Sequence, residues 1–170
     1  MIKKTLFFII FFYILSLIQT SFLAPFTILG KLPNLILVSV ILFLLFENSR
    51  DNFGFFVAFL GGFFIDIFSS HPFGMATIFL LFLAFLLKKL SASLKKMTPL
   101  WFSFSALLVL ILYNLFSEFA FYLLLPSVFQ INFGMLLSIE LIYNFILILV
   151  GFYLIHFSKK YAGFFFSKPA

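Results

Sequence analysis

Long apolar runs, interrupted only by short clusters of polar and charged residues, make up most of this chain of 170 residues. A helix needs about 20 apolar residues to cross the hydrocarbon core of a bilayer. Hydrophobic residues account for 65% of the chain and charged residues for 9%, whereas soluble proteins contain about 45–50% and about 25%. Five acidic and eleven basic residues cannot cover the surface of a soluble globule. The composition therefore argues against a soluble enzyme, a nucleic-acid-binding domain and a disordered protein.

The runs predict an all-α, polytopic integral membrane protein with a single transmembrane domain over residues 1–170. The second and third runs have short apolar stretches. If these two do not cross the membrane, we expect them to form together a hairpin that stays on one side of it. The six expected spans are Thr5–Leu23, Leu32–Arg50, Phe53–Ser70, Phe73–Leu90, Leu100–Leu125 and Ile131–Phe157.

The first run resembles the start of a cleaved signal peptide, because Lys3 and Lys4 precede an apolar segment. However, residues 19–25 contain no A-x-A cleavage pattern, and Pro25 directly follows Ala24. The apolar stretch continues to Leu23, which is long enough to span a bilayer. We therefore expect the first run to be retained as a helix.

The basic residues predict the orientation of the chain. With the N-terminus in the cytoplasm, ten of the eleven basic residues fall in cytoplasmic segments, and only Lys31 falls outside. Cytoplasmic segments of membrane proteins are enriched in lysine and arginine. We therefore expect both termini in the cytoplasm. We expect the chain to contact the lipid bilayer and to bind no nucleic acid.

A basic loop joins the fourth and fifth expected spans, and it could anchor the chain to anionic lipid headgroups. The alternative is a docking site for a cytoplasmic partner. Its lysines are Lys88, Lys89, Lys95 and Lys96.

Asp66 ends a stripe of small residues in the third span. Gly54, Ala58, Gly62 and Asp66 are spaced four apart and share one helix face. Small residues at this spacing let a second helix approach closely. One interpretation is a packing face, with Asp66 near the outer interface and hydrated by the loop that follows. The other is that Asp66 receives a partner helix, a loop or a substrate.

The fifth and sixth spans carry a second polar feature, which we call the polar seam: Asn114, Glu118, Glu140 and Asn144. The expected connection over residues 126–130 is short, so the two helices should be antiparallel neighbours. Both glutamates would then lie roughly 10–14 Å below the outer loop. The seam could be an inter-helix hydrogen-bond clamp, a ligand or partner pocket open to the outside, or part of a proton relay.

Features of common catalytic and cofactor sites are missing from the sequence. It has no cysteine, its two histidines are far apart, and it contains no H-E-x-x-H, G-x-S-x-G or glycine-rich phosphate motif. We therefore expect no metal, no cofactor and no enzymatic activity. An enzyme acting on lipid would have to use Glu118 and Glu140 as acid and base.

Four short segments follow one another in a characteristic order. The first span ends in Gln19–Leu23, and the second begins with Leu32–Leu35. The third carries Gly61–Asp66, and a tight outer turn follows at Pro72–Gly74. This order resembles the MreD family, the small membrane subunit of the bacterial rod-shape complex. Gly62, Asp66, Pro72 and Gly74 match the best-marked stretch of the family, whereas the polar seam matches no family motif.

The resemblance implies a multi-pass protein of the bacterial inner (cytoplasmic) membrane, with a non-enzymatic role in rod shape, cell elongation and lateral peptidoglycan synthesis. It implies MreC as the main partner, with MreB, RodA and a penicillin-binding transpeptidase in the same complex. The stripe and turn from Gly54 to Gly74 would hold the membrane segment of the partner. The alternative is a substrate-binding membrane subunit of a vitamin or metal importer, for which the polar seam would be the outward-facing site.

Overall fold

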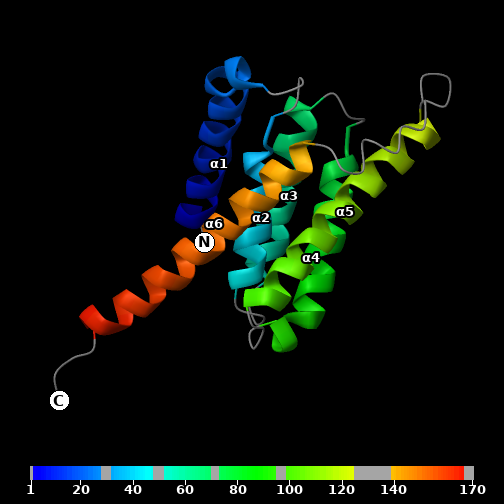
Figure 1. The fold of residues 1–170 in the computed structure, drawn as a ribbon. Coiled ribbons are helices and arrows are strands. Elements are labelled where there is room, and N and C mark those ends of the chain that lie inside the picture. The colour runs from blue at the N-terminus through cyan, green and yellow to red at the C-terminus, as the bar shows by residue number, and fades with distance from the viewer. Residues whose placement is uncertain are drawn as a thin grey trace.

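The computed structural model describes residues 2–27, 32–47, 52–69, 73–94, 99–124 and 139–166. These residues form helices and no strand, which confirms the all-α class (Figure 1). The elements are α1 (Ile2–Leu17) with the short helices η1 (Ile18–Phe22) and η2 (Ala24–Phe26), then α2 (Leu35–Phe46), α3 (Phe53–Phe68), α4 (Met75–Leu94), α5 (Pro99–Leu124) and α6 (Ile139–Phe166).

Successive helices run in opposite directions through the bundle (Figure 1). The end of α1, the start of α2, the end of α3 and the starts of α4 and α6 therefore lie toward one end of the bundle. We call this the upper end, because it is at the top of Figure 1. Residues from five helices can meet there.

Helix α2 lies at the centre of the bundle. It contacts α1, α3, α4 and α6, and none of its twelve residues is exposed. A helix that is hydrophobic on all sides is stable when other helices surround it. Phenylalanines contribute to this packing, since the Phe8 ring lies 5.0 Å from that of Phe43 and 5.5 Å from that of Phe53.

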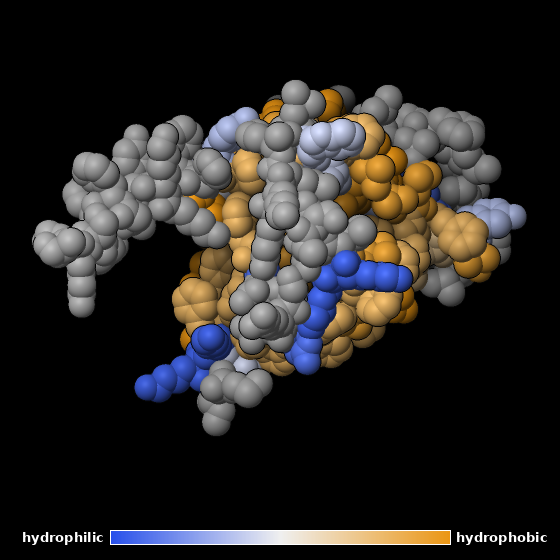
Figure 2. All heavy atoms as spheres, turned by 90° about the horizontal axis from the view of Figure 1, so that it is seen from below, coloured by the Kyte–Doolittle hydropathy of each residue, from blue (hydrophilic) through white to orange (hydrophobic). Residues whose placement is uncertain are grey.

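The outside of the bundle is also apolar. Phe22 is 67% exposed and Trp101 62%, and Figure 2, a view from below, shows broad hydrophobic areas with few hydrophilic side chains. An apolar surface this extensive favours a non-aqueous surrounding. Within the described residues, two helical stretches are long and apolar enough to cross a bilayer, Lys3–Phe22 and Trp101–Ala120.

The six expected spans correspond to six helices, but their lengths differ from the prediction. Helices α2 and α3 have 12 and 16 residues, so the two spans with short apolar stretches are short helices. The described part of α6 covers Ile139–Phe166, and its expected start at Ile131 lies among residues 125–138, outside the described residues.

Candidate functional site

The carboxylate of Asp66 binds the start of α4. The backbone N–H of Ala76 donates to its Oδ1 at 2.9 Å, and the backbone N–H of Thr77 donates to its Oδ2 at 3.1 Å. The Thr77 hydroxyl also donates to Oδ2, at 2.6 Å. The first backbone amides of a helix have no partner within the helix, and a carboxylate there is favoured by the helix dipole. Asp66 therefore caps a helix other than its own.

Asp66 is only 4% exposed. Its burial differs from the expectation that the following loop hydrates it, and its position relative to the outer interface stays a prediction. The charge is compensated by three donors from α4. The partner of Asp66 in the structure is therefore a helix, α4, of the same chain.

The small-residue stripe is buried inside the chain. A Cβ atom at Gly62 would lie 2.8 Å from the Thr77 backbone nitrogen and 3.1 Å from the Ala76 carbonyl carbon. Ala58 is fully buried, and the Gly54 backbone N–H donates to the Glu47 carboxylate at the end of α2. The stripe thus packs against α4 and the end of α2, within the same chain.

Gly74 occupies the turn just before α4, and its φ of +93° suits a residue without a side chain. The preceding Phe73 is 68% exposed. Pro72, the remaining residue of the expected outer turn, lies outside the described residues.

Three side-chain amides meet at the start of α2, and we call Gln19, Asn34 and Asn144 the carboxamide cluster. Gln19 Oε1 accepts from the Leu35 backbone N–H at 3.1 Å, and Asn144 Oδ1 accepts from the Asn34 backbone N–H at 2.7 Å. Asn34 Oδ1 accepts from the Leu37 backbone N–H at 3.0 Å. The first turn of α2 is therefore capped by its own asparagine and by side chains from η1 and α6.

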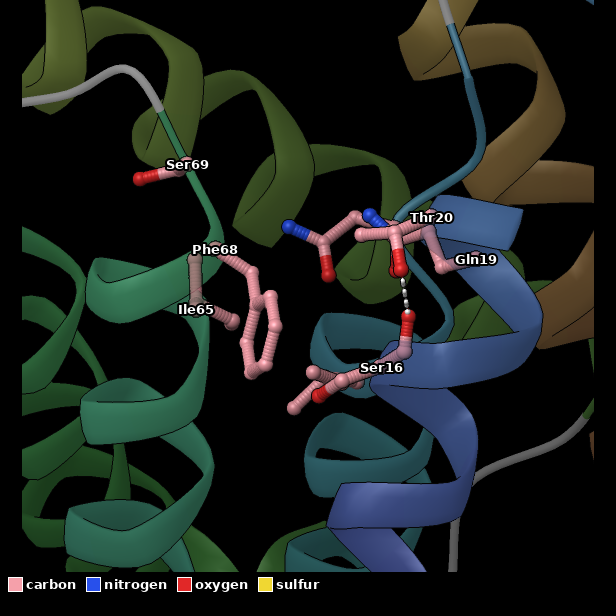
Figure 3. A pocket seen from close by; sticks show the side chains of 8 residues that line it. Ser16, Gln19, Thr20, Ile65, Phe68 and Ser69 are labelled. Carbon is pink, nitrogen blue, oxygen red and sulfur yellow. Dashed lines mark hydrogen bonds between the residues drawn. The ribbon is translucent and has the colours of Figure 1, made fainter. Parts of the chain in front are cut away.

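A small cavity lies beside the cluster, between α1 and α3 (Figure 3). The cavity is lined on one side by Ser16, Gln19 and Thr20 and on the other by Ile65, Phe68 and Ser69. Asn34 and Ile36, at the start of α2, complete the lining. The volume is about 20 Å³. A polar cavity of this size has room for about one ordered water molecule.

The polar seam is not assembled as a single feature between α5 and α6. Asn144 is 3% exposed and faces the start of α2. Glu140 acts electrostatically on Tyr113 of α5, whose hydroxyl is hydrogen-bonded to Ser117. Because α6 packs between α2 and α5, its two polar residues face different helices.

The other two members of the seam, Asn114 and Glu118, lie on α5. The Nδ2 atom of Asn114 is buried and has no hydrogen-bond partner among the described residues. Glu118 is half-buried.

Two lysines of the basic loop belong to α4. Lys88 donates to the Asn52 side chain and lies 5.2 Å from the centre of the Phe55 ring, whereas Lys89 is exposed. Lys95 and Lys96 lie outside the described residues.

Several residues that organise the site were not singled out from the sequence. Thr77 donates to Asp66 near the end of α3, and Glu47 accepts from Gly54 at the start of α3. The sequence marks these two residues only by their positions. Thr77 lies near the start of the apolar run that follows the glycine turn, and Glu47 directly follows the apolar run of the second expected span. Within the described residues, no group of three histidine, cysteine or acidic side chains could hold a metal ion.

Comparisons with known proteins give no match: no family model, no curated protein and no solved structure is similar to this chain.

Proposed function

We propose that the chain is a non-enzymatic, multi-pass subunit of a bacterial cell-elongation complex, similar in role to MreD. One observation carries the proposal. Gln19, Asn34 and Asp66, which belong to the segments that resemble MreD, all bind backbone amides at helix starts at the upper end. Residues that are far apart in sequence thus serve one structural purpose.

The proposal places the protein in the inner membrane, with both termini in the cytoplasm. The apolar exterior and the alternating helix directions support this placement. The short central α2 is compatible with it, because helix ends inside a membrane protein can be satisfied by protein side chains instead of water.

The outer turn is the proposed contact for MreC. The stripe itself is covered by α4, so Gly62, Asp66 and Gly74 would act by holding the turn in place. The turn then presents Phe73, whose ring is supported by an edge-to-face contact with Phe63 at 5.9 Å. Exposed, rigid aromatic residues are frequent anchors of protein interfaces.

Depletion of the protein in its own host, grown in vitamin- and metal-rich medium, tests the proposal. We expect rods to widen and become round, as seen by microscopy. Normal shape, with a growth defect only when one nutrient is withheld, would contradict the proposal and favour the importer.

A substitution of Phe73 tests the proposed contact. Phe73→Ser should reduce recovery of MreC with the purified protein, whereas Phe82→Ser, at a similarly exposed site in the middle of α4, should not. Equal recovery with both variants would remove Phe73 from the interface.

The cavity beside the carboxamide cluster is not a vitamin site. Pockets for small-molecule ligands usually measure about 300–1,000 Å³, and this cavity measures about 20 Å³. An importer would have to bind its substrate elsewhere.

A further inference from the structure

The cavity between α1 and α3 brings four polar side chains to one small space (Figure 3). They are Ser16, Gln19, Thr20 and Asn34. The inner lining is buried, since Ser16 is 1% exposed, Asn34 7% and Ile65 4%. Thr20 is exposed and therefore lies at the open side. The cavity thus leads from the surface at the upper end to buried polar groups.

The hydroxyl groups of Ser16 and Thr20 offer the cavity hydrogen-bond acceptors. Ser16 Oγ donates its hydrogen to the Phe12 carbonyl at 2.8 Å, and Thr20 Oγ1 donates to the Ser16 carbonyl at 2.8 Å. A hydroxyl group has one hydrogen and two acceptor lone pairs. Because both hydrogens are bound to backbone carbonyls, each oxygen can only accept from a molecule in the cavity.

The side-chain amides of Gln19 and Asn34 offer the opposite kind of group. Gln19 Oε1 accepts from the Leu35 backbone N–H, and Asn34 Oδ1 accepts from the Leu37 backbone N–H. These bonds fix the orientation of both amides, because a flipped amide would place its NH₂ group against a backbone N–H. What each amide can offer the cavity is therefore its NH₂ group, which donates.

We propose that the cavity binds one ordered water molecule, which joins α1 and η1 to the start of α2. The water donates its two hydrogens to Ser16 Oγ and Thr20 Oγ1, and it accepts from the NH₂ groups of Gln19 and Asn34. The volume of about 20 Å³ holds about one water. Buried waters typically make about three hydrogen bonds, and these four side chains offer enough partners for them.

The same side chains disfavour an ion in this place. A cation would meet the NH₂ groups of Gln19 and Asn34, and an anion would meet hydroxyl oxygens whose hydrogens are bound elsewhere. The eight described residues that line the cavity include no charged side chain. A neutral molecule of one heavy atom that both donates and accepts matches this lining, and water is that molecule.

Hydroxyl-radical labelling tests the site, because radicals formed from a bound water by X-rays oxidise the side chains that touch it. The full-length protein is irradiated in vesicles of phosphatidylethanolamine and phosphatidylglycerol, and oxidation is located by mass spectrometry. Ile65 and Ile41 are compared, since both are buried but Ile65 lines the cavity and Ile41 does not. We expect Ile65 to be oxidised and Ile41 to stay unlabelled.

A double variant tests the assigned hydrogen bonds. Ser16→Ala combined with Thr20→Val removes both acceptor hydroxyls and leaves the open side of the cavity in place. The water then loses the partners for its two hydrogens, so labelling of Ile65 should fall to the level of Ile41.

Ser39→Ala is the matched control for this variant. Ser39 Oγ also donates to backbone carbonyls of its own helix, but Ser39 does not line the cavity. Labelling of Ile65 should therefore remain at the level of the parent. Circular dichroism checks folding, and if the double variant does not fold, Thr20→Val alone should lower the labelling of Ile65.

Three results would overturn the proposal. The first is equal labelling of Ile65 and Ile41 in the parent, and the second is unchanged labelling of Ile65 when the acceptor hydroxyls are removed. The third is a higher unfolding temperature in sodium or potassium chloride than in choline chloride of the same concentration, which Ser16→Ala abolishes. That result would assign the cavity to a cation. The proposed role in cell elongation does not depend on any of them.

Discussion

At the residue scale, Asp66 joins two helices through one carboxylate. It lies near the end of α3 and binds the first amides of α4, across the turn that contains Gly74. A buried carboxylate is costly without donors, and each unsatisfied amide of a helix start is costly as well. The pairing removes both costs and sets the angle at which α4 leaves the turn.

Removal of this carboxylate should destabilise the fold. We expect Asp66→Ala to lower the free energy of unfolding by about 1–3 kcal/mol, because α4 loses its cap. Asp66→Asn keeps one acceptor oxygen and should cost less. Thermal unfolding of the purified protein in detergent, followed by circular dichroism, measures the difference. Equal stability of Asp66→Ala and the parent would show that the cap is not needed.

Gly62 is required for the close approach of α3 and α4. Gly62→Ala should destabilise the protein by about 1–3 kcal/mol, since its new Cβ meets the backbone of Thr77 and cannot be accommodated by a rotamer change. Gly151→Ala is the matched control, because its Cβ meets only the flexible Leu42 side chain. The same unfolding experiment checks both. A smaller loss for Gly62→Ala than for Gly151→Ala would contradict the close approach.

At the scale of elements, the start of α2 is the point where three parts of the chain are joined. Gln19 of η1 and Asn144 of α6 both accept from its first backbone amides. These bonds hold the peripheral α1 and the long α6 to the central helix. They also explain why two polar side chains are tolerated among apolar ones.

Loss of the Asn144 acceptor should expose the start of α2. In Asn144→Ala the Asn34 backbone N–H has no acceptor, which should cost about 1–3 kcal/mol. Amide hydrogen exchange should accelerate at Asn34, with a smaller change at Ala58 in the middle of α3. Asn144→Asp retains an acceptor and should stay close to the parent. Unchanged exchange in Asn144→Ala would contradict the assigned role.

At the scale of the whole molecule, alternating helices with an apolar exterior predict a fixed arrangement across the membrane. In the cysteine-free chain, a membrane-impermeant thiol reagent added to intact cells should label Ser21→Cys at the upper end. It should not label Lys3→Cys or Lys89→Cys until the membrane is opened. Labelling of Ser21→Cys and Lys89→Cys from the same side would contradict the six-span topology.

The sequence predicted some of these features well and others poorly. The apolar runs located the six α-helices of the described residues, and the scarcity of charge singled out Asp66, which is buried and hydrogen-bonded. The pairing of Asn144 was not foreseen. Helical spacing shows which residues share a face, but it does not show which helix that face meets.

The sequence by itself determined the helical class, the apolar exterior and the positions of the polar residues, because these follow from composition and local periodicity. Only the tertiary structure decided which helix is central, what Asp66 caps and how the polar seam divides between α2 and α5. Those outcomes depend on contacts between residues far apart in the chain. Asn34 and Asn144, for example, are 110 residues apart and 2.7 Å from donor to acceptor.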